Sequence, residues 1–267
     1  MEESRPTRFA TLTSAADEVR IEYQRIAGDA TAPTLVFLHE GLGSVSMWRD
    51  FPGRVAGATG CAALVYSRRG YGGSTPLAGA RAPDYMHVEA LSVLPALLDV
   101  LAIDDPVLIG HSDGASIALI HAGAAGRPAQ GKVRGVVALA PHVFVEPLSI
   151  ASIARAREQY ATTDLCSRLS RHHADVDSAF RGWNDIWLAP AFRRWNIEAL
   201  LPGIECPLLL IQGRDDEYGT LAQLDAIEAR VRGPVERVVL DDCGHSPQRD
   251  QPKATLAAMH RFIATLA

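Results

Sequence analysis

Short apolar runs alternate with amphipathic stretches along most of the chain, and this alternation restricts the possible folds more than any other feature of the sequence. Strands are expected in Glu18–Ile26, Thr34–His39, Ala62–Ser67, Pro106–His111, Val133–Ala140, Pro207–Gln212 and Val235–Leu240. The later runs are almost continuously apolar, which is typical of parallel strands buried on both faces. Repeated strand, helix and strand units predict an α/β fold with a doubly wound, mostly parallel sheet.

Between these runs, apolar residues recur at helical spacing. The positions are Leu91, Leu94, Leu98 and Leu101, then Leu221, Leu224, Ile227 and Val231, and finally Leu256, Met259, Ile263 and Leu266. Residues 145–203 break the alternation with a charged helical pattern and an aromatic segment. We expect a helical lid there, inserted before the last two strands and lying over the carboxyl edge of the sheet, where ligands bind in such folds. The core then comprises residues 1–144 and 204–267.

The composition excludes several classes of partner and location. The 267 residues include 26 Lys and Arg against 31 Asp and Glu, and this net charge of −5 gives no basic surface for nucleic acid or an anionic membrane. No apolar run approaches the ~18 residues that cross a bilayer, and the acidic start has no signal-peptide pattern. We expect a cytoplasmic protein without a membrane span, in which four separated cysteines are buried, reduced thiols. The oligomeric state is left open.

The segment Gly110-His111-Ser112-Asp113-Gly114 follows one predicted strand and precedes a predicted helix over Ala115–Ala124. A serine at so sharp a turn takes a strained backbone geometry that lifts its hydroxyl clear of the sheet. Glycines on both sides let the strand and the helix approach each other. This pattern, Gly-x-Ser-x-Gly, predicts a nucleophile at Ser112.

A serine hydroxyl needs a base within hydrogen-bond reach and a carboxylate that orients the base. His245 comes just after the last predicted strand, and the acidic loop Gly-Arg-Asp-Asp-Glu at 213–217 follows the strand Pro207–Gln212. Both segments are expected at the carboxyl edge of the sheet, on the same side as Ser112. The chain order of serine, acid and histidine matches one known arrangement of this catalytic group.

With these residues, nearly the whole chain resembles the α/β-hydrolase superfamily, and in particular its lidded serine hydrolases. Two further segments carry the resemblance. Leu38-His39-Glu40-Gly41 resembles the family's His-Gly oxyanion loop, and Arg69–Ser74 resembles its Arg-Gly-x-Gly-x-Ser segment. The resemblance implies an α/β-hydrolase fold. The family's acid commonly stands three residues after the glycine, which here selects Asp216, with Asp215 as the adjacent alternative.

The resemblance also implies an esterase-like reaction, and no cofactor is expected because the sequence shows no nucleotide fingerprint, metal-ligand set or cofactor lysine. Ser112 would attack the carbonyl and form an acyl-enzyme, His245 would transfer the proton, and Asp216 would hold the imidazole tautomer. The backbone N–H groups of Gly41 and Asp113 would stabilise the oxyanion. Water activated by His245 would then release the acid. The expected substrate is a small carboxylic ester, with thioesters and lactones as close alternatives.

Two other functions remain open at this point. Carbon–carbon bond hydrolases of the same superfamily cleave vinylogous keto acids, and they need a cation such as Arg68 or Arg181 near Ser112 to bind the substrate carboxylate. A small-molecule receptor on the same fold would bind its ligand without turnover. Haloalkane dehalogenases and epoxide hydrolases are disfavoured because they place a carboxylate where Ser112 stands.

Two carboxylates depart from the family pattern: Glu40 replaces the usual glycine after His39, and Asp113 follows the nucleophile. One interpretation is that only their backbone groups matter, with Asp113 at a helix N-terminus and Glu40 paired with Arg68 or Arg69. The other is that one carboxylate binds a substrate hydroxyl or relays a proton, which makes Glu40 a candidate substrate-binding residue. Ionised carboxylates at this place would repel an anionic substrate.

Aromatic and histidine residues supply the remaining candidates. Trp183 and Trp187 either pack within the lid or form the wall of a substrate pocket, and Trp195 and Trp48 raise the same question. His39 and His111 are expected to be structural hydrogen-bonding residues. A further group has residue types that can bind metals; it consists of His172, His173, Asp175 and Asp177. We expect these side chains to lie on a solvated helix face and not to form a metal site.

Overall fold

The computed structural model describes residues 6–13, 18–124 and 132–266, which form an eight-stranded sheet with the order β1-β2-β4-β3-β5-β6-β7-β8. The strands are β1 (Arg8–Thr13), β2 (Glu18–Ile26), β3 (Leu35–Leu38), β4 (Ala63–Tyr66), β5 (Val107–His111), β6 (Gly135–Leu139), β7 (Leu208–Gly213) and β8 (Val235–Leu240). From β4 to β8 all neighbours are parallel, whereas β1 and β2 are antiparallel additions at one edge. The predicted α/β fold and its mostly parallel sheet are confirmed.

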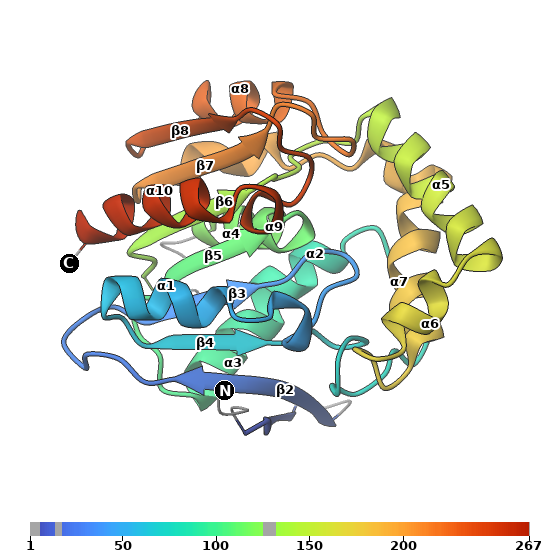
Figure 1. Cartoon of the computed structure of the whole chain (residues 1–267), viewed down its shortest axis with the longest axis horizontal. Coiled ribbons are helices and arrows are strands. Elements are labelled where there is room, and N and C mark those ends of the chain that lie inside the picture. Colours follow the sequence, from blue (N-terminus) through green and yellow to red (C-terminus); the bar gives the residue numbers. More distant parts are fainter. Residues whose placement is uncertain (1–5, 14–17, 125–131, 267) are drawn as a thin grey trace.

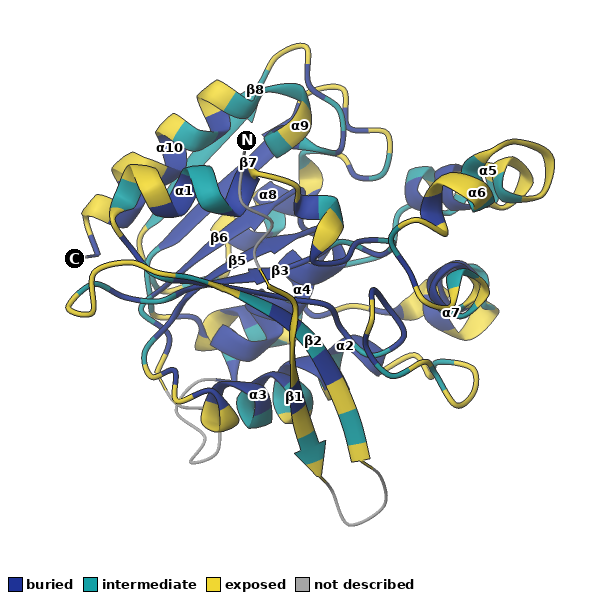
Figure 2. Ribbon diagram, turned by 60° about the horizontal axis from the view of Figure 1, so that its bottom comes forward, coloured by how far each residue is buried: buried dark blue, intermediate teal, exposed yellow. Residues whose placement is uncertain are grey.

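Alternate residues of the strands face two separate cores, one on each side of the sheet. On β3, Leu35 and Phe37 pack in one core, under α1 (Phe51–Thr59) and α10 (Pro252–Ala264). Val36 and Leu38 pack in the other core, under α3 (Leu94–Val100), α4 (Asp113–Gly123) and α8 (Ala222–Glu228). Figure 2 shows the strands as a buried layer between these two sets of helices. Because both faces are covered, the five strands from β4 to β7 in the sheet order are buried throughout and almost entirely apolar, which is the pattern seen in the sequence.

Helical segments connect the strands and cover both faces of the sheet. They are η1 (Ser46–Trp48), α1 (Phe51–Thr59), α2 (Tyr85–Val88), η2 (Glu89–Val93), α3 (Leu94–Val100), α4 (Asp113–Gly123), α5 (Pro147–Thr162), α6 (Leu165–Leu169), α7 (Val176–Leu188), η3 (Pro190–Arg194), η4 (Glu198–Gly203), α8 (Ala222–Glu228), α9 (Pro247–Asp250) and α10 (Pro252–Ala264).

Neither β1 nor α1 was expected from the sequence. In β1 only Ala10 is buried, so no alternating pattern marks the strand. In α1 two glycines weaken the helical signal.

The predicted insertion is helical and lies between β6 and β7, before the last two strands. In Figure 1 its helices α5, α6 and α7 lie beyond one end of the sheet, apart from the helices that cover its faces. The first turn of α7 is capped by Asp175, whose carboxylate accepts a hydrogen bond from the Ser178 N–H at 2.8 Å. Its apolar face buries Phe180, Trp183 and Trp187, which follow one another at helical spacing.

Within the three described ranges, no helix combines the length and the apolar character that crossing a membrane requires. All four cysteines are free thiols. Cys61 and Cys243 are buried, as expected, but Cys166 and Cys206 are partly exposed.

Candidate active site

Ser112 lies at the turn between β5 and α4 with a backbone φ of 52° and ψ of −118°, a strained conformation for a residue with a side chain. The flanking glycines leave no room for another residue. A Cβ on Gly110 would lie 2.3 Å from the Gly114 carbonyl oxygen, and a Cβ on Gly114 would lie 2.1 Å from the carbonyl oxygen of Leu38 on β3. The Gly-x-Ser-x-Gly pattern thus reflects the close packing of strand, turn and helix.

Replacing Gly114 with alanine is expected to lower the free energy of unfolding by about 3 kcal/mol, because the clash is with backbone atoms that cannot move aside. Gly57, an exposed residue in α1, is the matched control, since a Cβ added there would have no other atom within 4 Å. Its replacement by alanine should raise stability by about 0.5–1 kcal/mol. Urea unfolding followed by circular dichroism measures both. A Gly114→Ala variant as stable as the parent would contradict the role of this glycine in the turn.

The structure brings Ser112, His245 and Asp216 together from three distant parts of the chain. The Nε2 atom of His245 lies 2.9 Å from the Ser112 Oγ, and its Nδ1 lies 2.8 Å from an Asp216 carboxylate oxygen. The same Asp216 oxygen accepts the N–H groups of Tyr218 and Gly219 at 2.8 and 3.2 Å. An unbroken chain of hydrogen bonds therefore runs from carboxylate to imidazole to hydroxyl.

Asp215, the adjacent carboxylate, does not join this chain. Its side chain is exposed, and its backbone N–H donates to the Cys243 carbonyl at 3.0 Å. Asp216 is buried instead, because the turn that follows β7 directs its side chain inward onto the N–H groups of the next residues. Of the two acids that the sequence left open, only Asp216 contacts His245.

The surroundings of this pair shift both pKa values in the direction that keeps the two charges together. Burial opposes protonation of His245, but the charge and hydrogen bond of Asp216 outweigh it, and the pKa of His245 is raised. Burial also raises the pKa of Asp216, but His245 and the Tyr218 N–H outweigh it, and that pKa is lowered. An ionised Asp216 favours a proton on Nδ1, which leaves Nε2 to accept a proton from Ser112.

Of the residues expected to supply oxyanion donors, Gly41 lines the same cavity as Ser112, and Asp113 directly follows Ser112 in the chain. Asp113 is the first residue of α4, where backbone N–H groups have no partner within the helix. Gly41 follows β3 and is buried against α7. A Cβ on Gly41 would lie 2.2 Å from the indole ring of Trp183, so only glycine permits this contact.

Asp113 begins α4, as one interpretation of the sequence expected, but the Glu40 carboxylate is not paired with Arg68. The proposed pairing of the Glu40 carboxylate with Arg68 is wrong, because the guanidinium lies 3.7 Å from the carboxylate of Asp113 and donates to the Glu40 backbone carbonyl at 2.8 Å. The Glu40 carboxylate lies 3.5 Å from His111 Nδ1. Burial raises the pKa of Glu40, but His111 outweighs it and lowers that pKa to about 2. Glu40 is therefore ionised.

Ser112 and His245 line a cavity of about 230 Å³. Trp183 and Trp187 form part of its wall. The other lining residues are Glu40, Gly41, Leu42, His111, His142, Ile153, Glu217, Tyr218, Ser246 and Arg249. Sequence reasoning missed His142, although its place just after β6 put it at the same edge of the sheet. Burial lowers the pKa of His142 to about 3, so its imidazole is neutral.

The two other tryptophans lie outside this cavity. Trp195 packs behind Trp187, with a distance of 6.4 Å between ring centroids. Trp48 packs edge-on against Phe37 at 5.4 Å and stacks with Phe51 at 6.3 Å. Both therefore belong to the apolar core and not to the pocket wall.

The histidine pair in the insertion links loops and does not lie on a solvated helix face, which corrects our expectation. His173 is buried, accepts the Gly72 N–H at 3.0 Å and contacts the Leu42 carbonyl through its other nitrogen at 2.9 Å. His172 lies 2.8 Å from the Ser46 hydroxyl. Among the residues that the structure describes, no group of three His, Cys, Asp or Glu side chains is placed to hold a metal ion.

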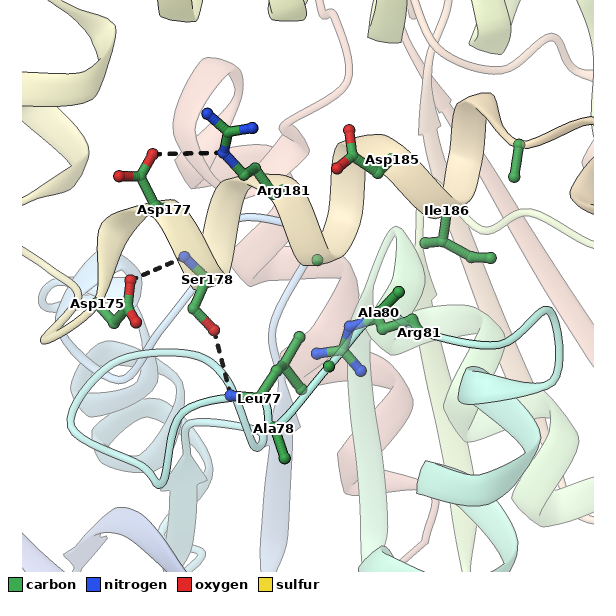
Figure 3. Close-up of a pocket in the computed structure, with 13 residues that line it drawn as sticks. Leu77, Ala78, Ala80, Arg81, Asp175, Asp177, Ser178, Arg181, Asp185 and Ile186 are labelled. Atoms are coloured by element: carbon green, nitrogen blue, oxygen red, sulfur yellow. Dashed lines mark hydrogen bonds and ion pairs between the residues drawn. The ribbon is translucent and has the colours of Figure 1, made fainter.

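Arg181 lines a different cavity. This cavity, of about 510 Å³, lies between α7 and the loop around Leu77–Arg81, as Figure 3 shows. The Arg181 side chain is 71% exposed and lies 3.7 Å from Asp177, one turn earlier on α7. Neither Arg181 nor Arg68 is among the residues that line the cavity at Ser112.

Known proteins resemble this chain in sequence over part of its length. A family model described as the alpha/beta hydrolase family matches residues 35–258. The sn-1-specific diacylglycerol lipase ABHD11 of Mus musculus is 29% identical over 123 residues, which are 44% of this chain and 38% of the lipase. Epoxide hydrolase A of Mycobacterium tuberculosis is 32% identical over 82 residues, 30% of this chain and 26% of that enzyme. The chain thus aligns with less than half the length of these relatives.

Solved structures match over almost the full chain. A hydrolase from Pseudomonas aeruginosa PA01 has a TM-score of 0.72 at 20% identity and covers 96% of this chain and 98% of its own. The enol-lactonase from Burkholderia xenovorans LB400 has a TM-score of 0.71 at 19% identity, with 96% and 100% covered. Carboxylesterase CesB from Bacillus subtilis has a TM-score of 0.69 at 20% identity, with 97% and 92% covered. At these identities the likeness concerns the fold alone.

Proposed function

Because the chain belongs to the alpha/beta hydrolase family, we propose that it is a serine hydrolase that cleaves a small carboxylic ester through an acyl-enzyme. The observation that carries this proposal is the hydrogen-bonded chain of Ser112, His245 and Asp216 at a cavity. The 2.9 Å bond between Ser112 and His245 has a length suited to proton transfer, and the 2.8 Å bond to Asp216 orients the imidazole. We also propose that the protein acts in the cytoplasm, since its free thiols are consistent with a reducing compartment.

In the proposed reaction, Ser112 Oγ attacks the ester carbonyl while His245 Nε2 takes the hydroxyl proton. The resulting imidazolium is stabilised by Asp216. The N–H groups of Gly41 and Asp113 bind the oxyanion. His245 returns the proton to the departing alcohol, and the acyl group remains on Ser112. His245 then removes a proton from water, whose attack on the acyl-enzyme releases the carboxylic acid and restores the serine.

An ester bond is favoured over an epoxide by the chemistry of the nucleophile. Attack of the Ser112 oxygen on an epoxide would leave an ether on the enzyme, and an ether has no carbonyl for water to attack. An acyl-enzyme has one. A carboxylate nucleophile avoids this problem because it forms an ester, but position 112 holds serine. The same argument applies to thioesters and lactones, which therefore remain within the proposed substrate class.

The walls of the cavity favour a small and uncharged acyl group. The volume of about 230 Å³ and the indole rings of Trp183 and Trp187 suit a short aliphatic or an aromatic acid. Because α7 supplies both rings, we propose that residues 145–203 act as the lid over a core of residues 1–144 and 204–267. Cleavage of a carbon–carbon bond in a keto acid has less support, because Arg68 is paired with Asp113 and Arg181 lines another cavity. Arg249 does line the cavity at Ser112, but its guanidinium is paired with Asp250 at 2.9 Å.

A panel of bond types tests the proposed function. We expect turnover of p-nitrophenyl butanoate and of a butanoyl thioester or γ-lactone, but no opening of styrene oxide. Opening of the epoxide without cleavage of any ester would overturn the proposal. Tight binding of a small ligand, with no turnover and no labelling by a fluorophosphonate, would favour the receptor function instead.

The charge of Glu40 predicts discrimination against anionic acyl groups. We expect kcat/KM for p-nitrophenyl butanoate to exceed that for mono-p-nitrophenyl succinate by about tenfold or more, because a second negative charge would lie within several ångström of an ionised carboxylate. Glu40→Gln should reduce this preference, whereas Glu158→Gln, an exposed residue of α5, should leave it unchanged. Equal rates for both esters in the parent enzyme would exclude this role of Glu40.

A further inference from the structure

Arg68 lies outside the substrate cavity but contacts both segments that carry the proposed oxyanion donors. Its side chain is 1% exposed, and the Asp113 side chain beside it is 0% exposed. The guanidinium donates to the backbone carbonyl of Glu40 at 2.8 Å and faces the Asp113 carboxylate at 3.7 Å. Gly41 follows the first of these residues, and Asp113 itself follows the nucleophile, so one cation joins the two sides of the oxyanion site.

The contact with Glu40 fixes the direction of the Gly41 N–H. The carbonyl of Glu40 and the N–H of Gly41 belong to one planar peptide unit, in which a trans bond directs them oppositely. That carbonyl accepts three hydrogen bonds, from Arg68 at 2.8 Å, from His39 Nδ1 at 2.7 Å and from the backbone N–H of Gly43 at 3.1 Å. Rotation of the peptide would break all three bonds, two of which involve buried side chains. Donors on the carbonyl also polarise the peptide and strengthen its N–H as a donor.

The tautomer of His39 depends on the same residue. The His39 Nε2 accepts the backbone N–H of Arg68 at 3.0 Å, so the proton resides on Nδ1 and is directed at the Glu40 carbonyl. Burial, together with the charge of Arg68, lowers the pKa of His39 well below its ordinary value. The imidazole is therefore neutral, as acceptance at Nε2 requires.

The contacts of the Asp113 carboxylate fix the position of the second segment that carries a proposed oxyanion donor. One of its oxygens accepts the Tyr85 hydroxyl at 2.6 Å, and the other accepts the indole N–H of Trp187 at 3.2 Å. These bonds hold the first residue of α4, and with it the second proposed N–H donor. Without Arg68, however, a buried negative charge would lie one residue from the developing oxyanion and would oppose it. The guanidinium neutralises that charge.

We infer that Arg68 is a positioning residue for the oxyanion hole: it orients the Gly41 N–H through the Glu40 carbonyl and neutralises the Asp113 carboxylate, without touching the substrate. This inference rests on the proposed function. It explains why an acidic residue is compatible with position 113, directly after the nucleophile.

Arg68→Lys tests the inference because it keeps the charge but cannot reach the carbonyl and the carboxylate with the same planar fork. With p-nitrophenyl butanoate, kcat is expected to fall about 30-fold while KM changes less than threefold, which is the signature of an interaction made only in the transition state. The affinity for a trifluoromethyl ketone, whose adduct carries the oxyanion, should fall by a similar factor. Arg134→Lys is the control, since it alters an Arg–Asp pair at the opposite end of the strands and should leave both values unchanged.

Asp113→Asn and the double variant complete the experiment. In the absence of the Asp113 carboxylate, Arg68→Lys should lower kcat/KM by a smaller factor. The loss of kcat/KM in the double variant should therefore be smaller than the product of the losses in the two single variants. If Arg68→Lys does not fold alone, it is measured in the Asp113→Asn background, where the buried ion pair that it disturbs is absent. The double variant must then have a lower kcat and ketone affinity than Asp113→Asn, because the hydrogen bond to the Glu40 carbonyl is lost, and equal values would overturn the inference. A folded Arg68→Lys enzyme with parental kcat would overturn it as well. A parent protein that neither hydrolyses the ester nor reacts with a fluorophosphonate would instead overturn the proposed function, and the inference with it.

Discussion

Ser112→Ala is expected to reduce ester hydrolysis by about 10⁵- to 10⁶-fold, the largest effect of any single substitution in this protein. The Oγ atom that lies 2.9 Å from His245 Nε2 is then missing, and no acyl-enzyme can form at this position. The residual rate would come from the oxyanion donors and from substrate binding. The measurements are kcat/KM for p-nitrophenyl butanoate and the mass added by a fluorophosphonate, determined on the intact protein.

Ser246→Ala is the matched control for this experiment. Ser246 also lines the cavity, directly after His245 in the chain, but no hydrogen bond joins its hydroxyl to the imidazole in the described structure. We expect this variant to be labelled at the parental stoichiometry and to retain activity within about tenfold. Labelling of the Ser112→Ala protein at another serine would show that the nucleophile is elsewhere.

Asp216→Asn is expected to lower kcat by about 10³- to 10⁴-fold. An amide cannot provide the negative charge that stabilises the imidazolium, and its NH₂ group favours the tautomer in which the proton of His245 resides on the wrong nitrogen. Asp215→Asn should change kcat less than about threefold, because the Asp215 side chain is exposed and does not contact His245. A larger loss in Asp215→Asn than in Asp216→Asn would identify Asp215 as the acid.

The same pair of variants should differ in pH dependence. Ser112 requires a neutral His245, so activity is lost as the pH falls through the pKa of His245. Asp216 raises that pKa above its ordinary value, and the acidic limb of the kcat/KM profile should therefore lie above about pH 6.5 in the parent enzyme. In Asp216→Asn the limb should move to lower pH, whereas in Asp215→Asn it should not move. Identical limbs in all three proteins would contradict the electrostatic coupling.

Much of the fold could be predicted because its elements are defined by local patterns. β5 and β7 are buried on both faces, so their nearly continuous apolar runs distinguish them from the helical segments. β2 was placed at the residues that the structure shows, although it lies near an edge of the sheet. β1 was not predicted because it is defined by its pairing with β2 and not by a buried face. Figure 2 shows that β1 is largely exposed at this edge of the sheet.

The candidate site was predictable to the extent that its residues lie in short motifs. Ser112 is marked by glycines that the turn itself requires, and His245 follows the last strand. Asp216 was selected over Asp215 only through the family resemblance, since adjacent residues face opposite ways and the folded turn decides which of them is buried.

The sequence by itself determined the α/β sheet, the helical insertion and the serine and histidine at the carboxyl edge, because apolar periodicity and glycine geometry act between near neighbours in the chain. Only the tertiary structure decided that Arg68 pairs with Asp113 and leaves the Glu40 carboxylate beside His111. These partners come from different strands and turns. The order of the strands and the positions of the hydrogen-bond acceptors around the buried guanidinium determine which charged groups are paired. No local sequence pattern predicts either of these.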